Sequence, residues 1–148
     1  MYNATNHFID RHTGKTSGVR VAYTDHAGDW TYQELAAMVN QAGNVLSNLG
    51  LKAEQRVLMC MTDSVWFPAV FWGAIKIGAV PVPVNTMLTG ADYAYMLHDS
   101  YARVLVVSES LYPKICTPYR RSVVSGRDSH RWFQHRWPTQ SVSADGVV

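Results

Sequence analysis

Hydrophobic residues between positions 30 and 110 follow two patterns, one typical of helices and one typical of strands, and the two take turns along the chain. Apolar residues at helical spacing predict an amphipathic helix over residues 35–49. Three short segments, 56–61, 79–84 and 103–107, are instead almost continuously apolar, which is typical of strands covered on both faces. The order from residue 35 onward is helix, strand, helix, strand, helix, strand. This alternation predicts an α/β fold with a partial parallel sheet and helices packed on its faces.

Capping signals mark the ends of two of these helices. Thr31 and Glu34 form a capping box, in which each side chain can bond to the backbone N–H of the other. Gly50 follows the last apolar position and predicts the end of that helix. Thr89 and Asp92 repeat the same capping spacing before a shorter helix that carries Tyr93, Met96 and Leu97. We therefore expect one helix to begin directly after Thr31 and the other directly after Thr89.

The helix between the first two strands is marked less clearly. Asp63 or Ser64 can cap it, Pro68 suits its first turn, and Gly78 ends it. Its aromatic residues are expected to pack in the core: Trp66, Phe67, Phe71 and Trp72. The apolar run over residues 65–84 has membrane-spanning length, but three prolines and Lys76 interrupt it, so we expect no membrane partner.

The amino-terminal part reads as a short helix followed by a hairpin. Residues 3–12 predict a helix whose apolar contacts are Phe8 and Ile9. Residues 19–24 predict a strand, and the turn at residues 25–28 leads back through Trp30.

Composition bounds the class of protein. A chain of 148 residues with 47% hydrophobic residues is typical of one soluble globular domain. Cys60 and Cys116 are too few for a disulfide framework, and Cys60 in its apolar run is expected to be a buried free thiol. The first twelve residues lack the basic and apolar regions of a signal peptide. A cytoplasmic location fits both features.

The charge distribution divides the chain. Residues 1–117 hold eight Lys and Arg against nine Asp and Glu, whereas residues 118–148 hold five Arg, two Asp and no Lys. Neither a helical nor an alternating period continues there, so we expect an irregular, disordered tail. The tail's cations are interleaved with aromatic rings, as in nucleic-acid-binding surfaces: Arg120, Arg121, Arg127, Arg131, Arg136, Trp132, Phe133 and Trp137. The alternative function is therefore a small nucleic-acid-binding or interaction protein, although no known nucleic-acid module surrounds these residues.

No catalytic, cofactor-binding or metal-binding residue is assigned from the sequence. Gly14, Lys15 and Thr16 imitate the end of a phosphate loop, but Ile9 stands where the first glycine belongs and the segment precedes a strand. The histidines lack metal-ligand spacing: His7, His12, His26, His98, His130 and His135. Ser64 lacks the glycine flanks of a nucleophile elbow, so helix capping is its simpler role.

Three segments carry a family resemblance: WTYQELAAMVNQAGNVLSNLGL (30–51), the run from residue 56 to 100 that contains GAIKIGAVPVPVNT and ADYAYMLHDS, and ARVLVVS (102–108). They resemble the N-terminal part of the adenylate-forming acyl-CoA synthetases, and are most similar to the benzoate–CoA ligase group. The resemblance implies the N-terminal subdomain of an AMP-binding domain over residues 1–114, and a non-homologous tail over residues 115–148.

The resemblance also implies a reaction for a full-length relative. ATP and an aromatic or other carboxylic acid give an acyl-adenylate, and CoA then displaces AMP, with Mg²⁺ offsetting the phosphate charge. The family's phosphate loop, ribose-binding segment and catalytic lysine have no counterpart in these 148 residues. We therefore expect a scaffold fragment that binds no cofactor and is inactive alone. Whether the chain is itself an enzyme stays open, and so does the identity of the acid.

Three origins of the tail stay open: a shifted reading frame in a longer ligase gene, a tail evolved for another role, and a stand-alone protein that binds acyl or nucleotide ligands without turnover. In each case the three strands belong to a sheet whose remaining strands lie elsewhere. We expect this sheet to expose an apolar, unpaired edge and the chain to be poorly soluble.

Overall fold

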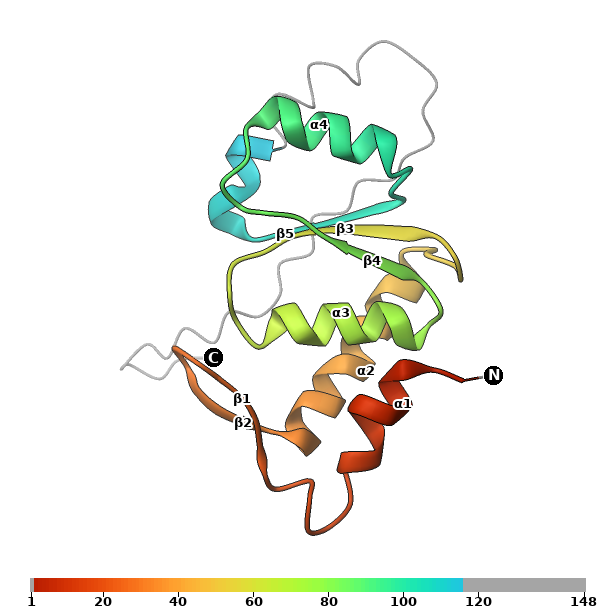
Figure 1. Ribbon diagram of the computed structural model, residues 1–148, viewed down its shortest axis with the longest axis vertical. Helices are drawn as coiled ribbons and strands as arrows, with labels where there is room; N and C mark the ends of the chain where they lie inside the picture. The colour runs from red at the N-terminus through yellow and green to blue at the C-terminus, as the bar shows by residue number, and fades with distance from the viewer. Residues whose placement is uncertain (1, 116–148) are drawn as a thin grey trace.

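The computed structural model describes residues 2–115, and the statements below concern that part of the chain. A parallel sheet lies between two layers of helices (Figure 1). Helices α1 (Ala4–Phe8), α2 (Tyr32–Asn48) and α3 (Trp66–Lys76) lie on one side, and α4 (Gly90–Asp99) lies on the other. The expected α/β fold with a parallel sheet is confirmed.

The sheet consists of β3 (Arg56–Cys60), β4 (Val80–Pro83) and β5 (Val104–Val107) in the order β4-β3-β5, with both pairs parallel. Central β3 is buried on both faces. Val57 and Met59 point into a core shared with α2 and α3, whereas Leu58 and Cys60 point into a core shared with α4. This alternation follows from the two-residue period of a strand.

One of the three strand predictions needs correction. Segment 79–84 was expected to be a strand covered on both faces, but β4 is only half-buried and Val80 is 40% exposed. The apolar run does not reveal this, because a strand at the edge of a sheet and a strand in its middle can have the same hydrophobicity. Pro81 and Pro83 are the signal that was available, since proline within sheets is confined largely to edge strands.

The amino-terminal segment forms two short turns and a hairpin. Helix α1 ends at Phe8, and the 3₁₀ helix η1 (Asp10–His12) follows it, so the single helix expected over residues 3–12 is broken at Ile9. Ile9 is buried, as expected, but Phe8 is 52% exposed and contacts the rings of His7 and Trp72. The hairpin consists of β1 (Val21–Asp25) and β2 (Gly28–Thr31), which are antiparallel.

Helices α2 and α3 pack against each other through two glycines. A Cβ built on Gly73 would lie 2.9 Å from the Gly43 nitrogen and 2.9 Å from the Val39 carbonyl oxygen. Such contacts are closer than real Cβ atoms make, so a side chain at Gly73 would push the two helices apart. The aromatic residues of α3 are partly buried against the core shared with α2 and against a further cluster that includes Leu35, Val39 and Ile9, so they pack in the core as expected.

Gly50 and Gly78 follow α2 and α3 with positive φ angles of 83° and 80°, so they end these helices as predicted.

In the part of the chain that the structure describes, no helix is long and apolar enough to cross a membrane. Cys116 and the tail residues 116–148 lie outside the described residues, together with the expected disorder and the Arg- and Trp-rich segment.

Candidate functional site at the carboxyl edge of the sheet

The carboxyl ends of the three parallel strands meet at one edge of the sheet, where open α/β sheets usually bind their ligands. Strand β3 leads into α3 on one face, whereas α4 precedes β5 on the opposite face (Figure 1). The chain therefore leaves β3 toward one face of the sheet and reaches β5 from the opposite face. Thr62 lies two residues after the end of β3 and Ser108 directly follows β5, and these two residues define the candidate site.

Thr62 and Ser108 join the ends of the two strands through their hydroxyl groups. The Thr62 backbone N–H donates to Ser108 Oγ at 2.9 Å, and the two hydroxyl oxygens lie 3.2 Å apart. The Ser108 N–H in turn donates to the carbonyl of Cys60 at 3.1 Å. These bonds fix the exit of β5 against the exit of β3. The arrangement offers hydroxyl groups for hydrogen bonding but no general base or nucleophile–base pair.

Asp25, at the tip of the β1–β2 hairpin, caps α3. Its Oδ2 accepts a hydrogen bond from the Val65 N–H at 2.8 Å, across forty residues of sequence. Its Oδ1 accepts from the Ala27 N–H at 2.9 Å and from Trp30 Nε1 at 3.1 Å. One carboxylate thus ties the hairpin to the loop that follows β3.

This finding corrects the predicted cap of α3. Asp63 or Ser64 was expected to cap the helix, but no side chain of the adjoining residues bonds to its first turn. The sequence rule fails here because it searches only the residues next to the helix, whereas the acceptor comes from a hairpin that folds against it. An aspartate at a hairpin turn was the only available signal, and turns favour aspartate for local reasons too.

The pKa of the Asp25 carboxyl is lowered. Partial burial acts to raise it, but hydrogen bonds from Val65, Trp30 and Ala27 to the charged form outweigh that effect, and nearby His26 adds to the lowering. Burial raises the pKa of neighbouring Tyr23, and the charges of Asp63 and Asp25 raise it further.

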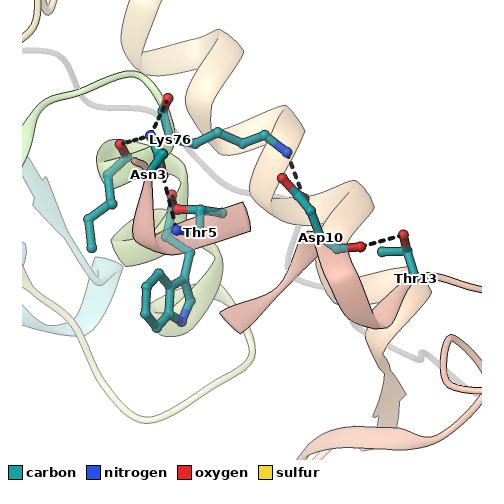
Figure 2. A network of polar contacts seen from close by, with 7 residues as sticks. Asn3, Thr5, Asp10, Thr13 and Lys76 are labelled. Atoms are coloured by element: carbon teal, nitrogen blue, oxygen red, sulfur yellow. Dashed lines mark hydrogen bonds and ion pairs between the residues drawn. The ribbon is translucent and has the colours of Figure 1, made fainter. Parts of the chain in front are cut away.

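The opposite end of α3 is held by the amino-terminal segment (Figure 2). Asn3 Nδ2 donates to the carbonyls of Ile75 and Lys76, at 3.0 and 3.2 Å, and so satisfies two carbonyls of the last turn. The fully buried Thr5 hydroxyl donates to the Trp72 carbonyl at 3.0 Å. Lys76 Nζ forms an ion pair with Asp10 at 2.8 Å. This network is a docking contact between helices, with no group free for chemistry.

Cys60 and Tyr93 form a polar pair in the core between β3 and α4. Burial raises the pKa of the Cys60 thiol, and burial together with the contact to Cys60 raises the pKa of Tyr93 to about 12. The Tyr93 hydroxyl donates to the Asn85 carbonyl at 2.8 Å. A thiol that is buried and hard to ionise is unreactive, so Cys60 is the free core cysteine that its sequence context predicts.

The sequence features that imitate a phosphate loop or a metal site do not lie together in the fold. Gly14, Lys15 and Thr16 lie in a turn between η1 and β1, away from any strand end. Arg11 bonds to the rings of His7 and His12 on the exposed side of α1 and η1. Within residues 2–115, no group of three His, Cys, Asp or Glu side chains could hold a metal ion.

Residues 9–142 match the family described as AMP-binding enzyme. The chain belongs to this family. The match continues beyond Lys114, where the sequence resemblance was expected to stop, and Ile115 at that point is buried against the α4 core. The boundary at residue 114 itself stays a prediction.

The curated relatives include benzoate–CoA ligases. The chain is 50% identical to the benzoate–CoA ligase of Thauera aromatica over 113 residues, which cover 76% of this chain and 21% of the relative. It is 37% identical to the 4-hydroxybenzoate–CoA/benzoate–CoA ligase of Rhodopseudomonas palustris over 133 residues, covering 86% of this chain and 25% of the relative. The chain thus spans about a fifth to a quarter of the length of these relatives.

Solved structures agree with the fold. A benzoate–CoA ligase from Burkholderia xenovorans superposes with a TM-score of 0.76 at 35% identity, over 81% of this chain and 24% of that chain. The anthranilate–CoA ligase AuaEII, in complex with anthranoyl-AMP, gives a TM-score of 0.76 at 29% identity, over 83% of this chain and 23% of that one. The described residues therefore correspond to the N-terminal portion of an AMP-binding domain, as the resemblance implied.

Proposed function

We propose that this chain forms the N-terminal α/β scaffold of an AMP-forming ligase that joins an aromatic carboxylic acid to CoA. The observation that carries the proposal is the 50% identity to the benzoate–CoA ligase of Thauera aromatica. A similar arrangement of sheet and helices in two aryl-acid ligases adds support. Benzoate-like acids are the proposed substrate class because both the sequence relatives and the structural relatives act on them.

ATP, Mg²⁺ and CoA are the proposed co-substrates and metal of the complete enzyme, since ligases of this family make an acyl-adenylate before the thioester. The described residues do not fit these groups. They offer no cluster of metal-binding side chains, and the turn at Gly14 lacks the strand before it that a phosphate loop requires. We therefore assign no reaction step to this chain. Its role is to hold the carboxyl edge of the sheet in place.

A chimeric ligase tests the scaffold role. The matching segment of the Thauera aromatica enzyme is replaced by residues of this chain, and AMP release is measured with benzoate, ATP and CoA. We expect benzoate-dependent activity to be retained. The same chimera carrying Gly73→Val is the control, because the packing of α2 on α3 should fail and activity should be lost. A chimera that melts cooperatively yet makes no benzoyl-CoA would refute the proposal.

The 148 residues alone are expected to be inactive. Purified chain incubated with ATP, Mg²⁺, benzoate and CoA should release no pyrophosphate above background, and benzoyl-CoA formation would overturn this expectation. We also propose that residues 1–114 form the ligase-like part, that residues 115–148 form a separate tail, and that the protein is cytoplasmic. The reduced, buried Cys60 supports that location.

A further inference from the structure

Helix α4 presents an acidic and aromatic face to solvent. Asp92, Tyr95 and Asp99 are all exposed and lie three and four residues apart, so they share one side of the helix. Tyr95 is 67% exposed, and Tyr101, which is 68% exposed, continues this surface through its contact with the ring of His98, 6.4 Å away between centroids. These five residues make up the α4 face. Exposed aromatic rings bordered by charged groups are typical of interaction surfaces.

The two carboxylates of the α4 face have no cationic partner among residues 2–115. The one ion pair in that part of the chain joins Lys76 to Asp10 on the opposite side of the sheet (Figure 1). Helix α4 itself contains no Lys or Arg. Hydrogen bonds from the hydroxyl and the N–H of Thr89 lower the pKa of the Asp92 carboxyl, so this group stays charged at neutral pH. The α4 face therefore favours a cationic partner.

The sequence that follows Ile115 has the complementary chemistry. Ile115 is 1% exposed and packs in the core between β3 and α4, so the described part of the chain ends in the layer that contains α4. Residues 127–136, with the sequence RDSHRWFQHR, hold three Arg against one Asp. Their cations are interleaved with aromatic rings: Arg127, Arg131, Trp132, Phe133 and Arg136.

We propose that residues 127–136 dock on the α4 face of the same chain. Their guanidinium groups then pair with the carboxylates of Asp92 and Asp99 and stack on the rings of Tyr95 and Tyr101, two contacts that arginine makes well. Residues 116–127 can span up to about 40 Å when extended, whereas the ten residues of α4 are about 15 Å long. The segment can therefore reach either end of the helix. The tether gives it a local concentration in the millimolar range, which populates contacts that are individually weak.

Two other occupants fit the α4 face less well. Nucleic acid carries negative charge, which Asp92 and Asp99 repel. A second copy could supply residues 127–136 in trans, but without the advantage of the tether. The rest of a second copy is not cationic, since residues 1–117 hold eight Lys and Arg against nine Asp and Glu. Docking within one chain is therefore the arrangement that charge and connectivity favour.

Photo-crosslinking of the complete chain tests the docking. Phe133→p-benzoylphenylalanine places a benzophenone in the segment, and illumination of a dilute solution captures its neighbours for mass spectrometry. We expect most crosslinks to join position 133 to residues 91–101 of the same chain. Asp99→Lys should lower this yield roughly threefold or more, because it replaces an attraction to arginine by a repulsion. Sodium chloride at about 0.5 M should lower it as well, since it screens exposed charges.

The control for net charge is Glu54→Lys, which makes the same change on an exposed loop before β3 and should leave the yield unchanged. Circular dichroism shows that each variant is folded. Crosslinks mainly to α3 or to the hairpin, or a yield that Asp99→Lys does not lower, would overturn the proposal. Covalent dimers on a denaturing gel would assign the segment to a second copy instead. Binding of a mixed-sequence oligonucleotide by a chain that gives no α4 crosslinks would assign it to nucleic acid.

Discussion

Helices α3 and α4 follow parallel strands on opposite faces of one sheet, yet their ends are fixed in different ways. Helix α4 carries its own cap: Thr89 Oγ1 accepts from the Asp92 N–H, and Asp92 accepts from the Thr89 N–H at 2.9 Å. Helix α3 has no such cap, and it is held at its start by Asp25 and at its end by Asn3. The start of α4 is thus specified by adjacent residues, whereas α3 depends on segments that must first fold against it. Changes at the distant contacts of α3 should therefore cost more stability than changes at local caps.

The largest effect is expected where α3 meets α2. Gly73→Val places a branched side chain where even a Cβ would meet backbone atoms at 2.9 Å, so we expect a loss of about 3 kcal/mol in the free energy of unfolding. Urea unfolding at one fixed protein concentration measures it. The control is Ala91→Val, at an exposed position of α4, where the loss should stay below about 1 kcal/mol. Equal losses at both sites would contradict the dependence of α3 on α2.

The distant cap of α3 should matter more than the local cap of α2. Asp25→Ala removes the acceptor of three hydrogen bonds, and a loss of about 2 kcal/mol is expected. Thr31→Ala removes the local cap of α2 and should cost about 1 kcal/mol. Hydrogen exchange at the first turn of α3 reports the same difference locally. The comparison fails if Thr31→Ala is the more destabilising change.

The charge on Asp25 gives this cap a pH dependence. Because the pKa is lowered in the folded state, its contribution is complete above the unfolded pKa and is lost as pH falls through the folded pKa. Asp25→Asn keeps one acceptor oxygen and removes the titration. Its stability difference from wild type should therefore shrink as the solution is acidified, and a difference that is constant between neutral and acidic pH would refute the role of the charge.

The same contrast explains which features the sequence predicts. The Thr31–Glu34 and Thr89–Asp92 capping boxes, the glycine stops and the order of helices and strands depend on neighbouring residues, and all of them are confirmed. The cap of α3 and the exposed edge of β4 depend on which segments meet in space, and both were predicted wrongly. Asp25 looks like an ordinary turn residue until the hairpin is docked. For the candidate site, the strand ends could be predicted, but the bond between Thr62 and Ser108 could not, since it requires the order β4-β3-β5.

A smaller effect is expected where α4 does depend on a distant partner. Tyr93 is fully buried and donates to the Asn85 carbonyl, so Tyr93→Phe should cost about 1 kcal/mol. The folded pKa of about 12 exceeds the ordinary value of 10.0. The contribution of Tyr93 is therefore complete below the unfolded pKa, and it is lost as pH rises from there through the folded pKa.

Denaturant midpoints measured across this alkaline range test the prediction. The advantage of wild type over Tyr93→Phe should fall with rising pH. Tyr95→Phe is the control on the same helix, because Tyr95 is 67% exposed and its substitution should leave the pH dependence unchanged. The same alkaline behaviour in both variants would mean that burial of Tyr93 is not its source.

The smallest effect is expected at the ion pair between Asp10 and Lys76. Both side chains are about a third exposed, at 31% and 29%, so solvent screens their attraction and the coupling should be about 0.5 kcal/mol or less. A double-mutant cycle with Asp10→Asn and Lys76→Met measures this coupling, which added salt should reduce further. Asn3→Ala removes two hydrogen bonds that Asn3 donates to carbonyls in the last turn of α3. It should lower the free energy of unfolding more than either charge variant. If the ion pair proves the stronger of the two, then charge rather than capping of the last turn holds the amino-terminal segment on α3.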